Sequence, residues 1–253
     1  MHAAIAYSVR VLDRHAHLFH VTLTIAEPAA DQVVSLPVWI PGSYLIREFS
    51  KTLQNLRANQ GKTPVELVQR DKRSWQATCT TKKPLVLTYE VYAFDNSVRT
   101  AWLDASRGFF NGTSLFLQVA GQECTPHELT LQADKTLVGW QIATGLAPVK
   151  VDKNGFGRYL AENYDELVDC PVEMGTFWSD TFVAGGLPHR FVVAGAPPSF
   201  DGARLVKDTQ SICEAEINFW HGAKKGRKKT NPPPHKHYLF MLNVVDDGYG
   251  GLE

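Results

Sequence analysis

The sequence predicts a mainly β protein, with a β-sandwich over residues 1–170 followed by the start of a mixed α+β domain over residues 171–253. Three observations lead to this fold class. Short runs of alternating apolar residues recur in the first part, turn-forming residues separate them, and a clear helical period occurs only after residue 200. Many short strands with frequent turns are typical of packed antiparallel sheets.

The strands expected in the first domain are short stretches in which apolar and polar residues alternate. They cover residues 4–12, 18–25, 32–38, 75–80, 85–94, 114–119 and 129–131. Turn chemistry lies between them at Pro41-Gly42, Asn59-Gln60-Gly61, Asn111-Gly112 and Asn154-Gly155. Alternation puts every second side chain on the same face of a strand, so we expect the sheets to enclose one apolar core.

The pattern changes after Pro171. Strands are expected at residues 181–184 and 190–194, a helix at about 201–220, and a last strand at 237–245. Ser199 and Asp201 are alternative N-caps for the helix. Strand, helix and strand in this order predict the first part of a second, mixed α/β domain, and its last residues here are Gly-Gly-Leu-Glu253.

Composition excludes several classes of function. Lys+Arg and Asp+Glu both number 26, so the net charge is zero, and neither nucleic acid nor a membrane is expected as a partner. The basic cluster at 224–229 is expected to be a solvated loop. Four cysteines lie far apart, which predicts free thiols, and the first residues show no secretory pattern, so a cytoplasmic location is expected.

The last residues carry the strongest site pattern. Gly250 and Gly251 lack a Cβ, so their backbone is able to run close to another chain. Glu253 offers a carboxylate beside that backbone for the ammonium group of a peptide, a charge-assisted contact of about 1.5–3 kcal/mol. The alternative is a plain turn that leads to a disordered terminal carboxylate.

Blocks along the whole chain resemble the glycyl aminopeptidase family, bacterial zinc peptidases that also carry a PDZ domain. The blocks are Leu36–Phe49, Val91–Arg99, Arg107–Phe116, Tyr164–Gly175 and Gly250–Glu253, and they follow the order of the family. The last block is also similar to the Gly-x-Met-Glu-Asn element of aminopeptidase N and its relatives.

This resemblance implies a β-sandwich packed on a thermolysin-like catalytic domain that holds zinc through two histidines and a glutamate. It implies removal of small N-terminal residues, glycine above all, from peptides with a free N-terminus. Glu253 would then bind the substrate amine, with Gly250 and Gly251 beside the substrate backbone. Asn111 and Arg107 would reach the same site from a sandwich loop, although turn structure explains these two residues as well.

The H-E-x-x-H helix and the PDZ domain of that family do not occur in these 253 residues. We therefore expect no catalytic residue and no bound zinc in this chain, and no activity by it alone. His127-Glu128 begins like the zinc motif, but Leu131 takes the fifth position and the segment is expected to be a strand. A non-catalytic binding module is the rival hypothesis. A further hypothesis pairs Tyr44, Arg47 and Glu48 at a domain interface, and the oligomeric state is left open.

Overall fold

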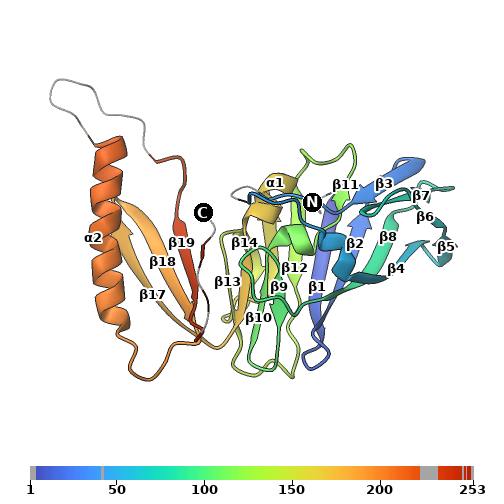
Figure 1. The fold of residues 1–253 in the computed structure, drawn as a ribbon. Helices are drawn as coiled ribbons and strands as arrows, with labels where there is room; N and C mark the ends of the chain where they lie inside the picture. The colour runs from blue at the N-terminus through green and yellow to red at the C-terminus, as the bar shows by residue number, and fades with distance from the viewer. Residues whose placement is uncertain (1–3, 41–42, 223–232, 247, 249, 252–253) are drawn as a thin grey trace. The chain divides into compact units, whose positions relative to one another are not determined.

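The computed structural model describes residues 4–40, 43–222, 233–246, 248 and 250–251, and it is mainly β, as predicted (Figure 1). The chain divides into two compact units. The first comprises Met1–Gly175 together with Tyr249–Glu253, and the second comprises Thr176–Gly248. The basic cluster at 224–229 and the turn at Pro41-Gly42 lie outside the described residues.

Among its described residues, the first unit contains short strands, two 3₁₀ turns and one short helix. Its first half holds β1 (Ile5–Asp13), β2 (Leu18–Ile25), β3 (Asp31–Ser35), η1 (Phe49–Thr52), β4 (Leu53–Gln60), β5 (Thr63–Val65), β6 (Leu67–Gln69), β7 (Ser74–Thr78) and β8 (Leu85–Tyr92). Its second half holds β9 (Ala101–Leu103), β10 (Arg107–Phe110), η2 (Gly112–Ser114), β11 (Gln118–Val119), β12 (His127–Leu131), β13 (Gln141–Thr144), β14 (Ala147–Val151), β15 (Gly157–Ala161), α1 (Tyr164–Asp169) and β16 (Val172–Gly175).

The largest sheet has the strand order β14-β15-β12-β1-β2-β8-β4-β5. Its central strands bury every second residue, as their alternating sequences predict. The antiparallel register sets Tyr7 of β1 opposite Leu23 of β2, and Val21 of β2 opposite Tyr89 of β8. Because these partners point to the same side, one face of the sheet is continuously apolar.

Two four-stranded sheets complete the first unit, in the orders β13-β16-β10-β9 and β11-β3-β7-β6. One hydrophobic cluster draws buried side chains from all three sheets, for example Leu87 of the largest sheet, Phe110 of the second and Val34 of the third. Each large apolar side chain that leaves water here contributes about 1.5–3 kcal/mol. The sheets therefore share a single core.

Leu115–Leu117 crosses this core without forming a strand. Tyr89, Tyr164 and Tyr7 donate hydrogen bonds from their hydroxyl groups to its first, second and third carbonyls, at 2.7, 2.7 and 2.6 Å. The strand predicted over 114–119 is therefore wrong except for Gln118–Val119. Tyrosine hydroxyls satisfy the buried carbonyls here in place of a neighbouring strand.

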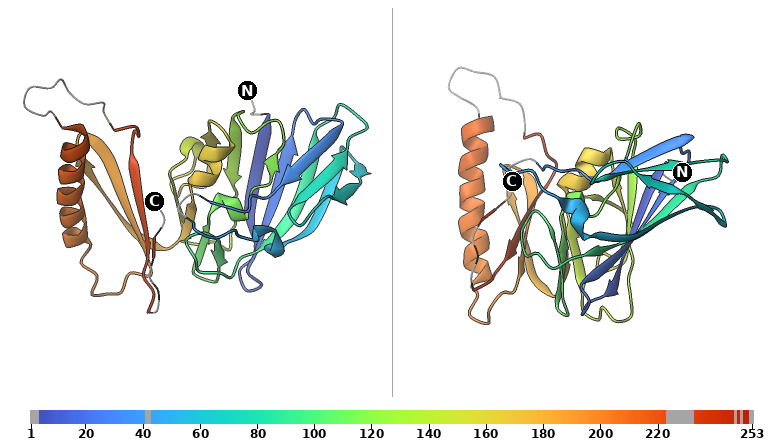
Figure 2. Two further views of the ribbon diagram at one scale, coloured as in Figure 1. Left: turned by 45° about the horizontal axis from the view of Figure 1, so that its top comes forward. Right: turned by 45° about the vertical axis from the view of Figure 1, so that its right-hand side comes forward.

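The second unit consists of β17 (Phe177–Ala184), β18 (Leu187–Ala194), α2 (Gly202–His221) and β19 (Tyr238–Asn243) within its described residues. β18 lies between the other two strands, antiparallel to β17 and parallel to β19. The predicted succession of two strands, a helix and a last strand is confirmed. Figure 2 shows α2 running along this sheet, and the helix packs against β17.

Helix α2 begins at one of the two N-caps that the sequence predicted. Asp201 caps the helix by accepting a hydrogen bond from the backbone N–H of Arg204 at 3.0 Å. Gly202 lies so close to Trp178 that a Cβ built on it would be 2.3 Å from the indole ring. The exposed fractions of Ile212 and Trp220 are 62% and 66%, although both are apolar.

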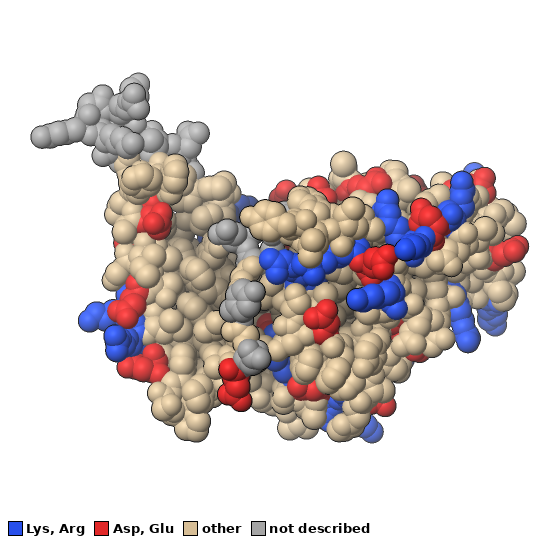
Figure 3. All heavy atoms as spheres, in the orientation of Figure 1, with Lys and Arg blue, Asp and Glu red and all other residues tan. Residues whose placement is uncertain are grey.

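On the face of the first unit that Figure 3 shows, the surface charges are of both signs. In the orientation of Figure 3, Lys and Arg side chains are interspersed with Asp and Glu side chains over the strands of the first unit. This distribution agrees with the zero net charge of the sequence. In the part of the chain that the structure describes, neither helix is long and apolar enough to span a membrane.

Candidate functional site

The two glycines near the end of the sequence lie in open space. Gly250 has φ +125°, a conformation that residues with a side chain rarely adopt. A Cβ added to Gly250 or to Gly251 would meet no described atom within 4 Å. The backbone at these residues is therefore open to approach by another chain. Leu252 and Glu253 lie outside the described residues, so the predicted carboxylate has no position in the structure.

Gly251 is tied to the sandwich unit by one polar contact. The Nη2 of Arg99 donates to the carbonyl oxygen of Gly251 at 3.4 Å. The Nε of the same guanidinium is buried and has no hydrogen-bond partner among the described residues. Arg99 belongs to the loop 95–100, between β8 and β9, so this loop contacts the backbone of the predicted substrate-binding segment.

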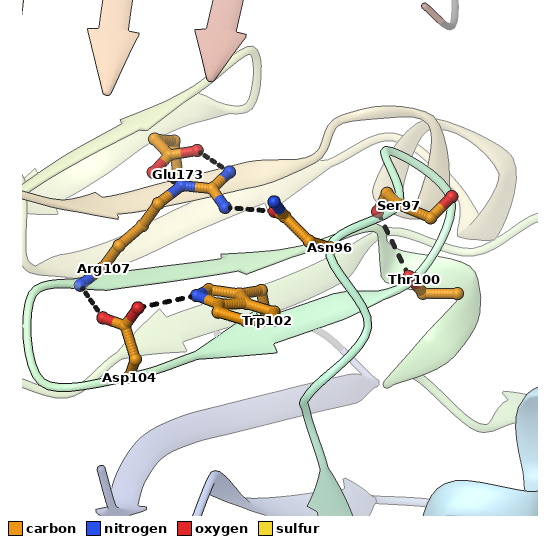
Figure 4. A network of polar contacts seen from close by, with 7 residues as sticks. All are labelled: Asn96, Ser97, Thr100, Trp102, Asp104, Arg107 and Glu173. Atoms are coloured by element: carbon orange, nitrogen blue, oxygen red, sulfur yellow. Dashed lines mark hydrogen bonds and ion pairs between the residues drawn. The ribbon is translucent and has the colours of Figure 1, made fainter. Parts of the chain in front are cut away.

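Arg107 lies at the centre of a polar network (Figure 4). Its Nε and Nη2 donate to the two carboxylate oxygens of Glu173, both at 2.8 Å, and its Nη1 donates to Oδ1 of Asn96 at 3.0 Å. The exposed fractions of the two side chains of the ion pair are 14% and 4%. A two-point contact of this kind fixes both direction and distance. Arg107 therefore joins β10 to β16 and holds the loop 95–100.

The side chain of Asp104 holds the turn that leads into β10. Asp104 Oδ1 accepts from the backbone N–H groups of Ser106 and Arg107 at 2.7 and 2.8 Å. Its Oδ2 accepts from Nε1 of Trp102 at 2.9 Å. Burial favours the neutral acid, but these hydrogen bonds outweigh it and lower the pKa of Asp104 below its ordinary value. The turn is held by an ionised side chain.

Glu173 has the opposite electrostatic balance. Burial of this carboxyl group raises its pKa to about 7, and the ion pair and hydrogen bonds from Arg107 only partly oppose that shift. The group lies in β16, in which all residues are buried. It is therefore able to gain or lose a proton near neutral pH at the last strand of the first unit.

Asn111 is engaged inside the first unit. Its side chain is 1% exposed, and its Oδ1 accepts hydrogen bonds from the backbone N–H and the Oγ1 of Thr113 at 3.1 and 2.7 Å. It thereby caps η2. These contacts, with those of Arg107 to Glu173, support the structural explanation of both residues. Direct substrate contact by either residue stays a prediction.

The loop 95–100 nevertheless connects three of the residues that the sequence singled out. Asn96 accepts from Arg107, Arg99 donates to Gly251, and the carbonyl of Thr100 accepts from the backbone N–H of Asn111 at 2.9 Å. The loop overlaps the second of the family blocks, Val91–Arg99. The structure thus gathers parts of three separate sequence blocks around one loop.

A pocket of about 440 Å³ opens beside this loop. Its lining comes from the segment before and within η1, the end of β8, the loop and η2. Two members of the predicted interface group, Arg47 and Glu48, lie in the lining. Arg47 donates from Nε to Oγ of Ser43 at 3.3 Å, and Glu48 forms an exposed ion pair with Lys72 at 3.0 Å. Tyr44 is fully exposed, and the pairing of these three residues at a domain interface stays a hypothesis.

The described residues do not fit a zinc site. No group of three His, Cys, Asp or Glu side chains among them is arranged to hold a metal ion. His127 and Glu128 lie in strand β12, as expected, and His127 is fully buried while Glu128 pairs with Arg158 at 3.3 Å. Zinc chemistry is therefore not assigned to any residue described here.

Glu173 and Asn96, the partners of Arg107 in the network, escaped the sequence analysis for a physical reason. Glu173 lies within the apolar run of β16, and a single acid there gives no sign of its partner. Asn96 lies in a loop whose contacts depend on strands far along the chain. The one available signal was the acid itself, because a carboxylate in an otherwise buried strand requires a hydrogen-bonding partner.

Comparison with known proteins gives a family and a fold. The family model described as the Peptidase M61 N-terminal domain matches residues 6–176. A solved structure of an aminopeptidase N family protein from Idiomarina loihiensis is 39% identical with a TM-score of 0.91, covering 98% of this chain and 40% of that one. The chain thus spans well under half the length of that protein. A search of curated proteins returned no match.

More distant structures share the fold alone. An M1 zinc metallopeptidase from Deinococcus radiodurans is 14% identical with a TM-score of 0.51, covering 96% of this chain and 56% of that one. Aminopeptidase A of Legionella pneumophila, solved in complex with aspartic acid, is 10% identical with a TM-score of 0.52, covering 96% and 28%. The β-rich arrangement is therefore common to proteins with very different sequences.

Proposed function

The chain belongs to the peptidase M61 family through its N-terminal domain, and from that membership we propose that it forms the substrate-locating part of a zinc-dependent aminopeptidase. The enzyme removes small N-terminal residues, glycine preferred, from peptides with a free N-terminus. This chain by itself is inactive. The family match and the 39% identity to an aminopeptidase N family protein support the proposal. The cytoplasmic location stays a prediction.

One observation carries this proposal: the open backbone at Gly250 and Gly251. An extended peptide is able to lie along these residues because no described atom comes within 4 Å of the Cβ position of either. The contact from Arg99 to the carbonyl of Gly251 holds the segment against a loop of the first unit. Glu253, two residues further, then binds the substrate ammonium.

The role proposed for this chain is to bind the N-terminal ammonium group of the substrate. A carboxylate that binds the ammonium group of the substrate limits the enzyme to the first peptide bond, because an internal residue has no such charge. Zinc would supply Lewis-acid chemistry in the intact protein. Since the described residues hold no set of metal ligands, no catalytic step is placed on them.

The test uses the full-length protein and a series of glycyl, alanyl and leucyl anilides. We expect hydrolysis of the glycyl substrate to be fastest, and Glu253→Gln to lower kcat/KM by about tenfold to a hundredfold, the equivalent of one charge-assisted contact. Glu27→Gln, at an exposed position, is the matched control. Unchanged kcat/KM in Glu253→Gln would contradict the role of this carboxylate.

The rival function is a non-catalytic binding module, and the pocket inside the first unit favours it. The two functions differ in one measurement. A peptidase loses its activity to a chelator and regains it with zinc, whereas full-length protein that never releases a product from any of the anilides supports the module.

A further inference from the structure

The pocket beside the loop 95–100 is lined by two cationic side chains that have no ion-pair partner among the described residues. These side chains are Arg47 and Lys51. Of the two carboxylates in the lining, Glu48 is already held by Lys72, which leaves Asp95. The lining therefore presents two unpaired cations against one carboxylate, which favours an anionic ligand.

An aromatic surface lies on the same pocket. The exposed fractions of Tyr92 and Phe94 are 44% and 47%. Phe94 is stacked between His17 and Trp102, with ring centroids 3.9 and 4.5 Å away, so its position is fixed and its edge remains open. Rigid exposed aromatic groups beside polar ones are typical of binding sites, because they offer apolar contact at little cost in entropy.

The loop side of the pocket is held in place before any ligand arrives. Asp95 accepts from the backbone N–H of Ser97 through its side chain at 3.2 Å and from Oγ1 of Thr100 through its carbonyl at 2.9 Å. The next residue, Asn96, accepts from Arg107. A wall that is already ordered loses little conformational entropy on binding.

We propose that this pocket binds the C-terminal end of a peptide whose last residue is apolar. Arg47 and Lys51 bind the terminal carboxylate, and the last side chain packs against Tyr92 and Phe94. Asp95 accepts a hydrogen bond from a backbone N–H of the same peptide. The volume of about 440 Å³ lies within the range of small-ligand pockets.

Peptide is favoured over phosphate by the chemistry of the lining. A phosphate group has no apolar part to contact the aromatic edges, and its second negative charge is repelled by Asp95. A terminal carboxylate carries one negative charge, and the peptide supplies both an apolar side chain and a backbone donor. The site is separate from the glycine segment and does not depend on the proposed aminopeptidase activity.

The experiment titrates the 253-residue chain with N-acetyl-Ala-Phe as the free acid and as the C-terminal amide, by isothermal calorimetry and by the fluorescence of Trp102 and its neighbours. We expect saturable binding of the acid and binding of the amide weaker by at least about tenfold. Lys51→Met and Arg47→Met each weaken binding of the acid by a similar factor. Lys62→Met, at an exposed position away from the pocket, is the control and leaves it unchanged.

Four results would overturn the proposal. The first is equal binding of acid and amide, the second is inorganic phosphate that binds as tightly as the acid, and the third is acid binding that survives Lys51→Met. The fourth is the absence of any binding of the acid up to about 20 mM. Because Arg47 also contacts Ser43, the Lys51 variant keeps the test valid if Arg47→Met disturbs its loop.

Discussion

Arg107 and Glu173, which are 66 residues apart in sequence, form a two-point ion pair in which both N–O distances are 2.8 Å. The pair connects β10 with β16, two neighbouring strands, and it lies where the first unit ends. It also helps to hold the loop 95–100, because the third contact of Arg107 is with Asn96.

Removing one partner of this pair is expected to be strongly destabilising. In Arg107→Met the buried carboxylate of Glu173 loses its counter-charge, and we expect the free energy of unfolding to fall by about 3–5 kcal/mol. The double variant Arg107→Met/Glu173→Met removes both charges and should recover much of that loss. Urea unfolding of the wild type, Arg107→Met, Glu173→Met and the double variant measures the difference. A double variant as unstable as the sum of the two single changes would contradict this account.

The raised pKa of Glu173 predicts that stability falls as the pH rises. The folded state binds the proton of this group more tightly than the unfolded state, so the contribution is fully present below about pH 4.5. It is lost as the pH passes through about 7, and its size is roughly 3 kcal/mol at most. To measure this contribution, the free energy of unfolding of the wild type and of Glu173→Gln is compared from pH 4.5 to 8. If the difference in the free energy of unfolding between the two proteins does not vary with pH, Glu173 is not the source of a pH dependence.

His127 should act in the opposite direction. The ring is fully buried, it stacks on Tyr7, and burial lowers the pKa of its imidazole even though the carbonyl of Thr125 holds Nδ1 at 2.6 Å. A lowered pKa means that the neutral form is the stable one, so stability is lost as the pH falls below about 6.5. We expect His127→Phe to weaken this acid sensitivity, as judged by thermal unfolding at pH 5 and pH 7. Equal acid sensitivity in wild type and variant would contradict the assignment.

The tyrosine hydroxyls on Leu115–Leu117 should each contribute measurably to stability. In Tyr164→Phe the carbonyl of Phe116 stays buried without a donor, and the cost is about 1–3 kcal/mol. Tyr92→Phe alters a half-exposed ring and should change stability by less than about 0.5 kcal/mol. Chemical denaturation compares the two. Similar small effects from both would mean that the buried carbonyl finds another partner.

Close packing at the start of α2 should exclude even one methyl group. The Cβ of Gly202→Ala would lie 2.3 Å from the ring of Trp178, so the helix or the ring must shift. We expect a loss of about 1–3 kcal/mol, the usual cost of overpacking. Ala203→Ser, at the exposed neighbouring position, serves as the control. A Gly202→Ala protein as stable as the control would show that Trp178 moves aside freely.

Local patterns predicted a large share of the fold. Alternation identified β1, β2 and β8, because each has one face toward the core and the other toward its surroundings. Helical spacing with a cap at Asp201 identified α2. The same reasoning missed β16, since a strand buried on both faces has no alternation, and it missed β14, since an exposed strand has none either.

The sequence by itself determined the mainly β class, the helix α2 and the glycine pair, because these depend on neighbours within a few residues of one another. Tertiary structure alone decided that Arg107 pairs with Glu173, that tyrosines from three separate segments hold Leu115–Leu117, and that one loop contacts Arg107, Asn111 and Gly251. These contacts join residues far apart in the chain. A local sequence pattern does not identify the hydrogen-bonding partner of a buried polar group. Burial makes a partner necessary, and the sheet topology decides which residue lies close enough to be that partner.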